Sequence, residues 1–65
     1  MNQFLEDRAR VIVALNDLYR PEAHELWLRS PNPMLKGCTP HELIEAGEAE
    51  RVLDLIQALC EGVVF

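Results

Sequence analysis

The stretch "SPNPMLKGCTPHELIEAG", residues 30–47, contains three of the chain's four prolines and two of its three glycines. A proline forces the residue before it out of the α region, so Pro31 predicts that a helix ends just before it. Pro33 restricts Asn32 in the same way, and Gly37 supplies the free backbone angle that a change of direction requires. This stretch therefore predicts a stiff connector between two pairs of helices.

The second half of the stretch carries a complete helix start. Thr39 is expected to be the N-cap, Pro40 the first helical residue, and Glu42 the partner that completes a capping box. Gly47 is suited to ending this short helix, over residues 40–46, because glycine tolerates the left-handed conformation. Since the core of so short a chain is small, the connector is expected to set the angle between the helix pairs.

Two helices are predicted before the connector. Apolar residues at helical spacing indicate a first helix over residues 3–20, with Val13 pointing away from the apolar face. Pro21 can open a second helix over residues 21–30, in which Trp27 is expected to anchor the core. The predicted inner faces hold Phe4, Val11, Leu15, Leu18 and Tyr19 in the first helix and Ala23, Leu26 and Trp27 in the second, with Leu28 to the side.

A regular apolar pattern predicts the last helix, over residues 48–61, and Gly62 is expected to stop it. Its apolar face holds Val52, Leu55, Ile56 and Leu59; Leu43 and Ile44 are the buried side of the short helix, and Met34 and Leu35 are expected to enter the core from the connector. The predicted fold class is therefore all-α, a small bundle of four helices joined by a proline- and glycine-rich central connector.

Length and composition restrict the classes of protein. A chain of 65 residues makes one small compact domain, which buries only about 60% of the surface that its unfolded form exposes. Such domains usually need a staple, a partner or self-association. The apolar fraction of 49% excludes a disordered chain.

Charge and hydropathy exclude two kinds of partner. The net charge of −5 disfavours direct binding to nucleic acid, because phosphates repel an acidic surface. No apolar run approaches the ~20 residues needed to span a bilayer. The acidic start "MNQFLEDRAR" lacks the basic and apolar regions of a signal peptide. These features predict a cytoplasmic protein that does not bind membranes.

No catalytic, metal or cofactor site is expected. Cys38 and Cys60 are interpreted as free thiols, because small disulfide scaffolds usually carry four or more cysteines. With His24 and His41 they could be drawn as a zinc site, but the spacing fits no ligand pattern. Cys38 and His41 lack the third group that would orient a nucleophile and its base. The sequence therefore predicts a binding module and not an enzyme.

The chain ends in a short apolar tail. Val63, Val64 and Phe65 follow Gly62, and three apolar residues at a free terminus are expected to be buried. Two alternatives remain open, since the tail can fold back on its own core or insert into a partner.

Residues 22–65 resemble the C-terminal toxin-binding domain of the Xre/MbcA/ParS antitoxins. The matching residues are Trp27-Leu28, Pro31-Asn32-Pro33, Leu35, Gly37, Thr39-Pro40, Glu42-Leu43, the helix from Val52 to Leu59, and Gly62-Val63. The resemblance divides the chain into an N-terminal helix, 1–20, and a toxin-binding domain, 21–65. Most of the shared residues form turns and caps, so they indicate the fold directly and the function by association.

The resemblance implies an antitoxin of a type II toxin–antitoxin system whose partner is a RES-domain toxin, an enzyme that destroys NAD. In such pairs the C-terminal end of the antitoxin covers or enters the active-site cleft of the toxin. The residues expected to bind the toxin here are Gly62, Val63, Val64 and Phe65.

The start of the chain departs from the family pattern. These antitoxins usually carry an N-terminal helix-turn-helix region, whereas the segment before the match is expected to form one helix, so DNA binding by this chain is not expected. The alternative function is a small helical homo-oligomer that serves as an interaction or regulatory module, in which Val13 contacts another copy.

Overall fold

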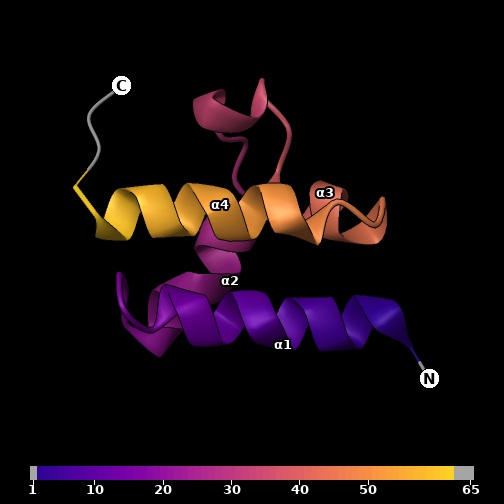
Figure 1. Cartoon of the computed structure of the whole chain (residues 1–65), viewed down its shortest axis with the longest axis horizontal. Helices are drawn as coiled ribbons and strands as arrows, with labels where there is room; N and C mark the ends of the chain where they lie inside the picture. Colours follow the sequence, from indigo (N-terminus) through magenta and orange to yellow (C-terminus); the bar gives the residue numbers. More distant parts are fainter. Residues whose placement is uncertain (1, 63–65) are drawn as a thin grey trace.

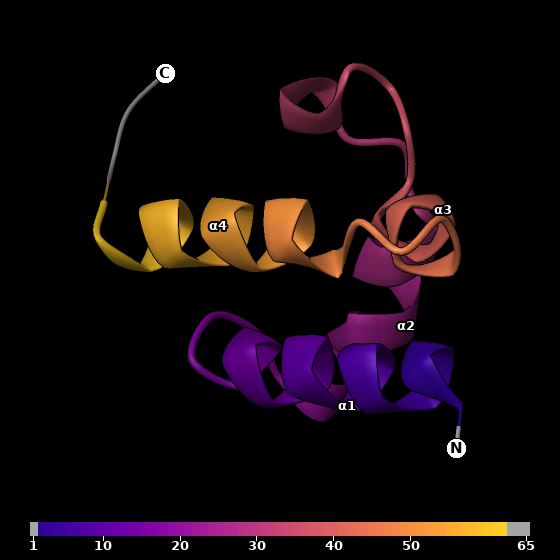
Figure 2. The ribbon, with the colours of Figure 1, turned by 45° about the vertical axis from the view of Figure 1, so that its right-hand side comes forward.

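The computed structural model describes residues 2–62, and this part of the chain contains four α-helices and one short 3-10 helix (Figure 1). Their bounds are α1 Gln3–Leu15, α2 Pro21–Arg29, η1 Pro33–Leu35, α3 Pro40–Glu45 and α4 Ala49–Cys60. Helix α4 packs along α1, and α3 contacts α1, α2 and α4 (Figure 2). The predicted all-α bundle is confirmed. The predictions for Val63, Val64 and Phe65 lie outside the described residues.

The hydrophobic core draws side chains from all five elements. Its buried members are Val11, Leu15, Leu28, Leu35, Leu43, Ile44, Ala49, Val52, Leu55 and Ile56. Leu35, from η1, is only 3% exposed, so the connector fills part of the core as predicted. Met34 was expected to do the same but is 41% exposed, because neighbouring residues of a 3-10 helix point in different directions.

Helix α1 is shorter than predicted. It ends at Leu15 and not at residue 20, and the N–H groups of Leu18 and Tyr19 both bond to the Leu15 carbonyl in the turn that follows. Arg20 is extended, with ψ of 153°, because the next residue is Pro21. The chain needs this turn to reverse direction. Leu18 is therefore half-buried and Tyr19 exposed, both outside the helix.

The face that α2 buries was predicted wrongly. Leu28 is 1% exposed, whereas Leu26 is 72% exposed, and Trp27 is half-buried against the edge of the core. The inner face is instead His24 and Leu28, which lie one helical turn apart. His24 is 5% exposed, and its Nε2–H donates to the Tyr19 carbonyl at 3.1 Å. A polar residue thus occupies a core-facing position that a hydrophobic pattern does not reveal.

Hydrogen bonds close the connector around Asn32. Its Oδ1 accepts from the Met34 N–H at 2.9 Å, and its carbonyl accepts from Leu35 and Gly37. Its own N–H donates to the Cys38 carbonyl at 3.0 Å. Gly37 has φ of +83°, the left-handed angle expected of it. Pro31 and Pro33, both exposed, flank Asn32 and restrict the backbone on either side.

The capping box of α3 forms as predicted. Thr39 Oγ1 accepts from the Glu42 N–H at 3.0 Å, and Glu42 Oε1 accepts from the Thr39 N–H at 2.9 Å. Buried Pro40 opens the helix. At the other end the Glu48 N–H bonds to the Leu43 carbonyl and Gly47 takes φ of +80°, which is a Schellman motif. Both ends of this six-residue helix are therefore fixed by local bonds.

Charged and aromatic contacts attach α1 to its neighbours. Arg10 Nη2 donates to Glu50 of α4 at 2.9 Å, and Arg8 pairs with Glu25 of α2. The Phe4 ring meets the His41 ring of α3 edge-on, with centroids 5.5 Å apart.

None of the helices within residues 2–62 combines the length and apolar character that crossing a membrane requires.

Candidate functional site

The residues singled out from the sequence fall into two groups in space. Pro31, Asn32, Pro33, Gly37, Thr39, Pro40 and Glu42 all lie in the connector or at the start of α3, with Trp27 just before them in α2. Gly62 lies beyond the opposite end of α4, with φ of +75°. Figure 2 shows this separation, with α3 beside the start of α4 and the C-terminal half of α4 extending away from it. The first group shapes the domain, and only Gly62 marks the proposed binding end.

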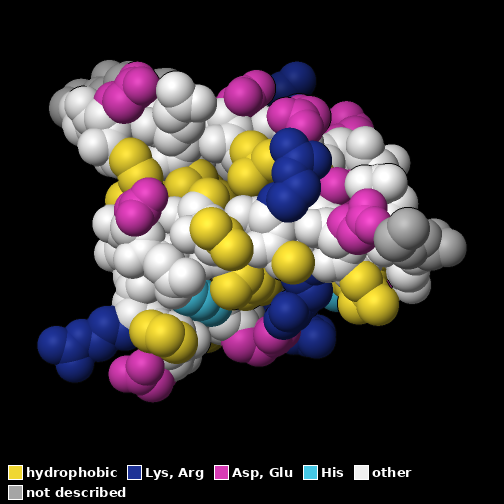
Figure 3. Space-filling model, turned by 60° about the horizontal axis from the view of Figure 1, so that its bottom comes forward, with side chains coloured by type: hydrophobic (Ala, Val, Ile, Leu, Met, Phe, Trp, Pro, Cys, Tyr) yellow, Lys and Arg dark blue, Asp and Glu magenta, His cyan; other side chains and the backbone are white. Residues whose placement is uncertain are grey.

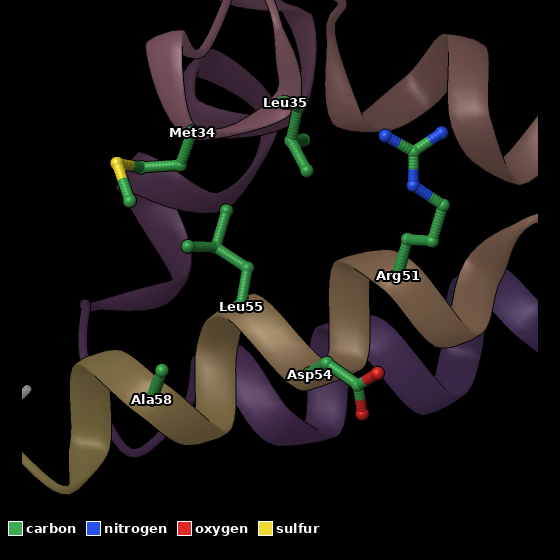
Figure 4. Close-up of a pocket in the computed structure, with 6 residues that line it drawn as sticks. All are labelled: Met34, Leu35, Arg51, Asp54, Leu55 and Ala58. Carbon is green, nitrogen blue, oxygen red and sulfur yellow. The ribbon is translucent and has the colours of Figure 1, made fainter. Parts of the chain in front are cut away.

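A hollow of about 320 Å³ lies on the connector side of α4. Its lining residues are Met34, Leu35, Arg51, Asp54, Leu55 and Ala58. Figure 4 shows Leu55 pointing from α4 toward Met34 and Leu35 of η1, with the side chains of Arg51 and Asp54 farther along α4. The hollow therefore has an apolar floor and one charge of each sign beside it.

A second hollow, of about 290 Å³, lies where α4 passes the end of α1. It is lined by Ala14, Asp17, Leu53, Ile56, Gln57 and Cys60. Cys60 is exposed and Leu53 half-buried. The C-terminal half of α4 is thus flanked by a depression on each side. We call this half of the helix, together with its two hollows, the α4 surface.

The α4 surface has the make-up of a protein-binding surface. The two carboxyl groups whose pKa is lowered belong to structural contacts: the Arg29 side chain lowers the pKa of Glu25 within α2, and the Thr39 N–H lowers that of Glu42 at the start of α3. Neither carboxylate lines a hollow. Within residues 2–62, no group of three or more His, Cys, Asp or Glu residues is arranged to hold a metal ion. An apolar floor with a charged rim is the pattern of a binding interface.

A third depression, of about 250 Å³, lies on the outer side of α2 and was missed by the sequence analysis. It is lined by Tyr19, Ala23, Leu26, Trp27 and Ser30. The apolar spacing of Ala23, Leu26 and Trp27 is the signal that marks it, but in the sequence this spacing was interpreted as a core-facing side.

Comparison with known proteins identifies the family. A sequence model described as the antitoxin Xre/MbcA/ParS C-terminal toxin-binding domain matches residues 14–62. Proteins named mycobacterial cidal antitoxin MbcA, from Mycobacterium tuberculosis and Mycobacterium bovis, are 39% identical over 61 residues, which are 94% of this chain and 54% of theirs. The chain therefore spans about half the length of these relatives.

The fold is also similar to a solved structure. One chain of the crystal structure of the M. tuberculosis MbcT–MbcA toxin–antitoxin complex superposes with a TM-score of 0.93 and 38% identity. The superposition covers 98% of this chain and 58% of that one. The family match, the sequence identity and the fold agree along the same residues. The chain belongs to the antitoxin Xre/MbcA/ParS C-terminal toxin-binding domain family.

Proposed function

We propose that the chain is an antitoxin that binds and inhibits a RES-domain toxin, an enzyme that degrades NAD. The observation that carries the proposal is the close match, at a TM-score of 0.93, to a chain of a toxin–antitoxin complex. The class of toxin comes from the family resemblance. Because NAD is an intracellular cofactor, the chain would act in the cytoplasm beside its toxin.

The α4 surface and the tail after it form the proposed contact with the toxin. The two hollows provide apolar floors of the kind that receive a partner's side chains. Gly62, with φ of +75°, has the left-handed angle typical of a helix end, and Val63, Val64 and Phe65 follow it in the sequence. A terminal aromatic that enters a cleft is an anchor worth about 2 kcal/mol or more of binding energy.

Charge adds to the proposed fit. The chain carries a net charge of −5, and a cleft that binds the phosphates of NAD needs basic residues. Opposite charges accelerate association and favour the correct partner. In this proposal residues 21–65 contact the toxin. Helix α1 supports them from behind through Val11 and Leu15, which are fully buried.

The test measures NAD consumption by the cognate RES-domain toxin while the chain is titrated in. We expect inhibition at equimolar chain. Deleting residues 63–65 is expected to leave the helical circular dichroism spectrum intact and to weaken inhibition at least tenfold, about 1.4 kcal/mol. Leu26→Ala, at an exposed position on α2, is the control and should inhibit like the parent chain.

Each other outcome has a definite meaning. A toxin that consumes NAD at an unchanged rate with excess folded chain would overturn the antitoxin proposal. If truncation melts the helices, the tail belongs to the chain's own core. If truncation alters neither folding nor inhibition, the contact lies on the α4 surface without the tail.

A further inference from the structure

The outer face of α1 carries an apolar stripe that no other described element covers. Leu5, Ala9 and Val13 follow one another at intervals of four residues, so they lie on one side of the helix. All three are exposed, Leu5 by 60% and Val13 by 69%. Figure 3, seen from the α1 side, shows hydrophobic side chains across this face, with acidic and basic side chains around them.

The stripe is symmetric about its centre. In an antiparallel pair of α1 helices with the two-fold axis at Ala9, Leu5 of each copy faces Val13 of the other. The small Ala9 side chain at the axis allows a close approach, near the lower end of the usual 8–10 Å between helix axes. A face complementary to itself in this way suits an isologous contact with a second copy of the chain.

The charges beside the stripe fit the same register. Glu6 lies on one flank of the stripe, and the two-fold axis brings it beside Arg10 of the second copy. Arg10 has five N–H donors; Nη1 donates one to Asp7 and Nη2 donates one to Glu50. Its side chain is 53% exposed, so further donors can reach Glu6 of the other copy. The two Arg8 side chains also approach each other, and the adjacent Glu25 offsets their repulsion.

We propose that the stripe Leu5–Ala9–Val13 is the interface of an antiparallel homodimer. A second copy is a suitable occupant because the small core of a 65-residue chain gains from self-association. In Figure 1, η1 lies beyond α4 on the side away from α1. A dimer formed through α1 would therefore leave the connector-side hollow of each copy open.

The first experiment is sedimentation equilibrium of the 65-residue chain over rising concentration. One helix pair buries less than the roughly 1,200 Å² of a standard stable interface, so the dimer is expected at high micromolar concentration. The average mass should rise from 7.4 kDa toward twice that value. Val13→Glu should weaken dimerisation at least tenfold, because it brings a carboxylate into an apolar contact. Leu26→Glu is the matched control, since Leu26 is equally exposed but lies on α2.

The second experiment tests the register by cross-linking, in a chain with Cys38→Ser and Cys60→Ser. Ala9→Cys should form a disulfide dimer under mild oxidation, because the two copies meet at the axis. Leu5→Cys alone should not, since its two copies are offset by about 12 Å along the helices. Leu5→Cys mixed with Val13→Cys should cross-link. A monomeric chain at millimolar concentration would overturn the proposal, as would a dimer weakened by Leu26→Glu and not by Val13→Glu.

Discussion

The connector at residues 30–47 and the C-terminal half of α4 hold their shapes in different ways. In the connector, the single residue Asn32 forms hydrogen bonds with four later residues. Both ends of α3 are also capped. The C-terminal half of α4 has one strongly buried side, made by Leu55 and Ile56, and a hollow on each flank. The connector fixes the shape of the domain, and the end of α4 leaves surface free for binding.

This difference shows that, in this small domain, the residues that set the fold are not the ones proposed to bind a partner. Residues that match the family motif most densely, such as Asn32 and Thr39, satisfy backbone groups and contribute little open surface. On the α4 surface, which is proposed to meet the toxin, the match rests on the helix from Val52 to Leu59 and on Gly62, with no comparable cluster of turn and cap residues. Motif density in this chain therefore marks what sets the fold, and binding has to be tested by substitutions on both regions.

The largest expected effect comes from Leu35, the residue of η1 that is buried in the core. Leu35→Ala should lower the free energy of unfolding by about 2–5 kcal/mol, because it leaves a cavity under η1. That loss is a large part of the stability of a small domain. Met34→Ala is the neighbouring control, and since Met34 is 41% exposed it should change stability by less than about 0.5 kcal/mol. Urea melts of the two variants measure the contrast; equal losses would mean that η1 does not anchor the connector.

The second substitution tests the other region. Ala58 is half-buried on α4 beside the connector-side hollow. Ala58→Arg should weaken toxin inhibition at least tenfold, about 1.4 kcal/mol, by filling that hollow, while urea melts stay near those of the parent chain. Ala46→Arg, exposed at the end of α3, is the control and should inhibit normally. Unchanged inhibition by Ala58→Arg would remove this hollow from the proposed contact.

The sequence predicted the connector more accurately than the packing. The caps at Thr39, Gly37 and Gly47 follow from local backbone chemistry, which a sequence displays directly. The inner face of α2 was wrong because His24 is buried through its bond to the Tyr19 carbonyl, a contact between two segments.

Two other features also depend on the assembled fold. Helix α1 ends early because the chain needs a turn before Pro21, and the apolar pattern continues through that turn to Leu18 and Tyr19. The hollows beside α4 depend on the distances of α1 and η1 from α4, and no sequence pattern specifies those distances. Prediction from sequence thus succeeded for the caps and for most of the buried faces, and failed for the end of α1, the inner face of α2 and the hollows.

The third prediction concerns the cap of α3. Thr39→Ala removes the oxygen that accepts the Glu42 N–H at 3.0 Å, and should cost about 0.5–2 kcal/mol of unfolding free energy. Thr39→Ser keeps an acceptor in the same place and should restore most of the loss. Denaturant melts of both variants measure it. A Thr39→Ala variant as stable as the parent would mean that the connector holds its shape without the capping box.

The smallest expected effect is the response of the same cap to acid. Glu42 accepts a hydrogen bond from the Thr39 N–H, and that bond lowers the pKa of its carboxyl below the ordinary value of 4.5. A pKa lowered in the folded state stabilises the fold above the unfolded-state pKa, and this stability is lost as the pH falls through the folded-state pKa. Glu42→Gln can still accept the bond but cannot titrate, so its stability should decline less between neutral pH and acid.

Urea melts at several pH values, together with NMR titration of the Glu42 carboxyl, measure this acid response. Glu25, whose pKa is lowered by Arg29, is expected to keep part of the acid response in both chains. The Thr39→Ala variant provides the control, because the main cause of the shift is the backbone N–H of residue 39, which that substitution keeps. Its Glu42 pKa should therefore stay below 4.5 even though the variant is less stable. A Glu42 pKa at the ordinary value in the parent chain would show that the carboxylate leaves the Thr39 N–H in solution, and that the connector depends on its backbone bonds around Asn32 more than on its charged cap.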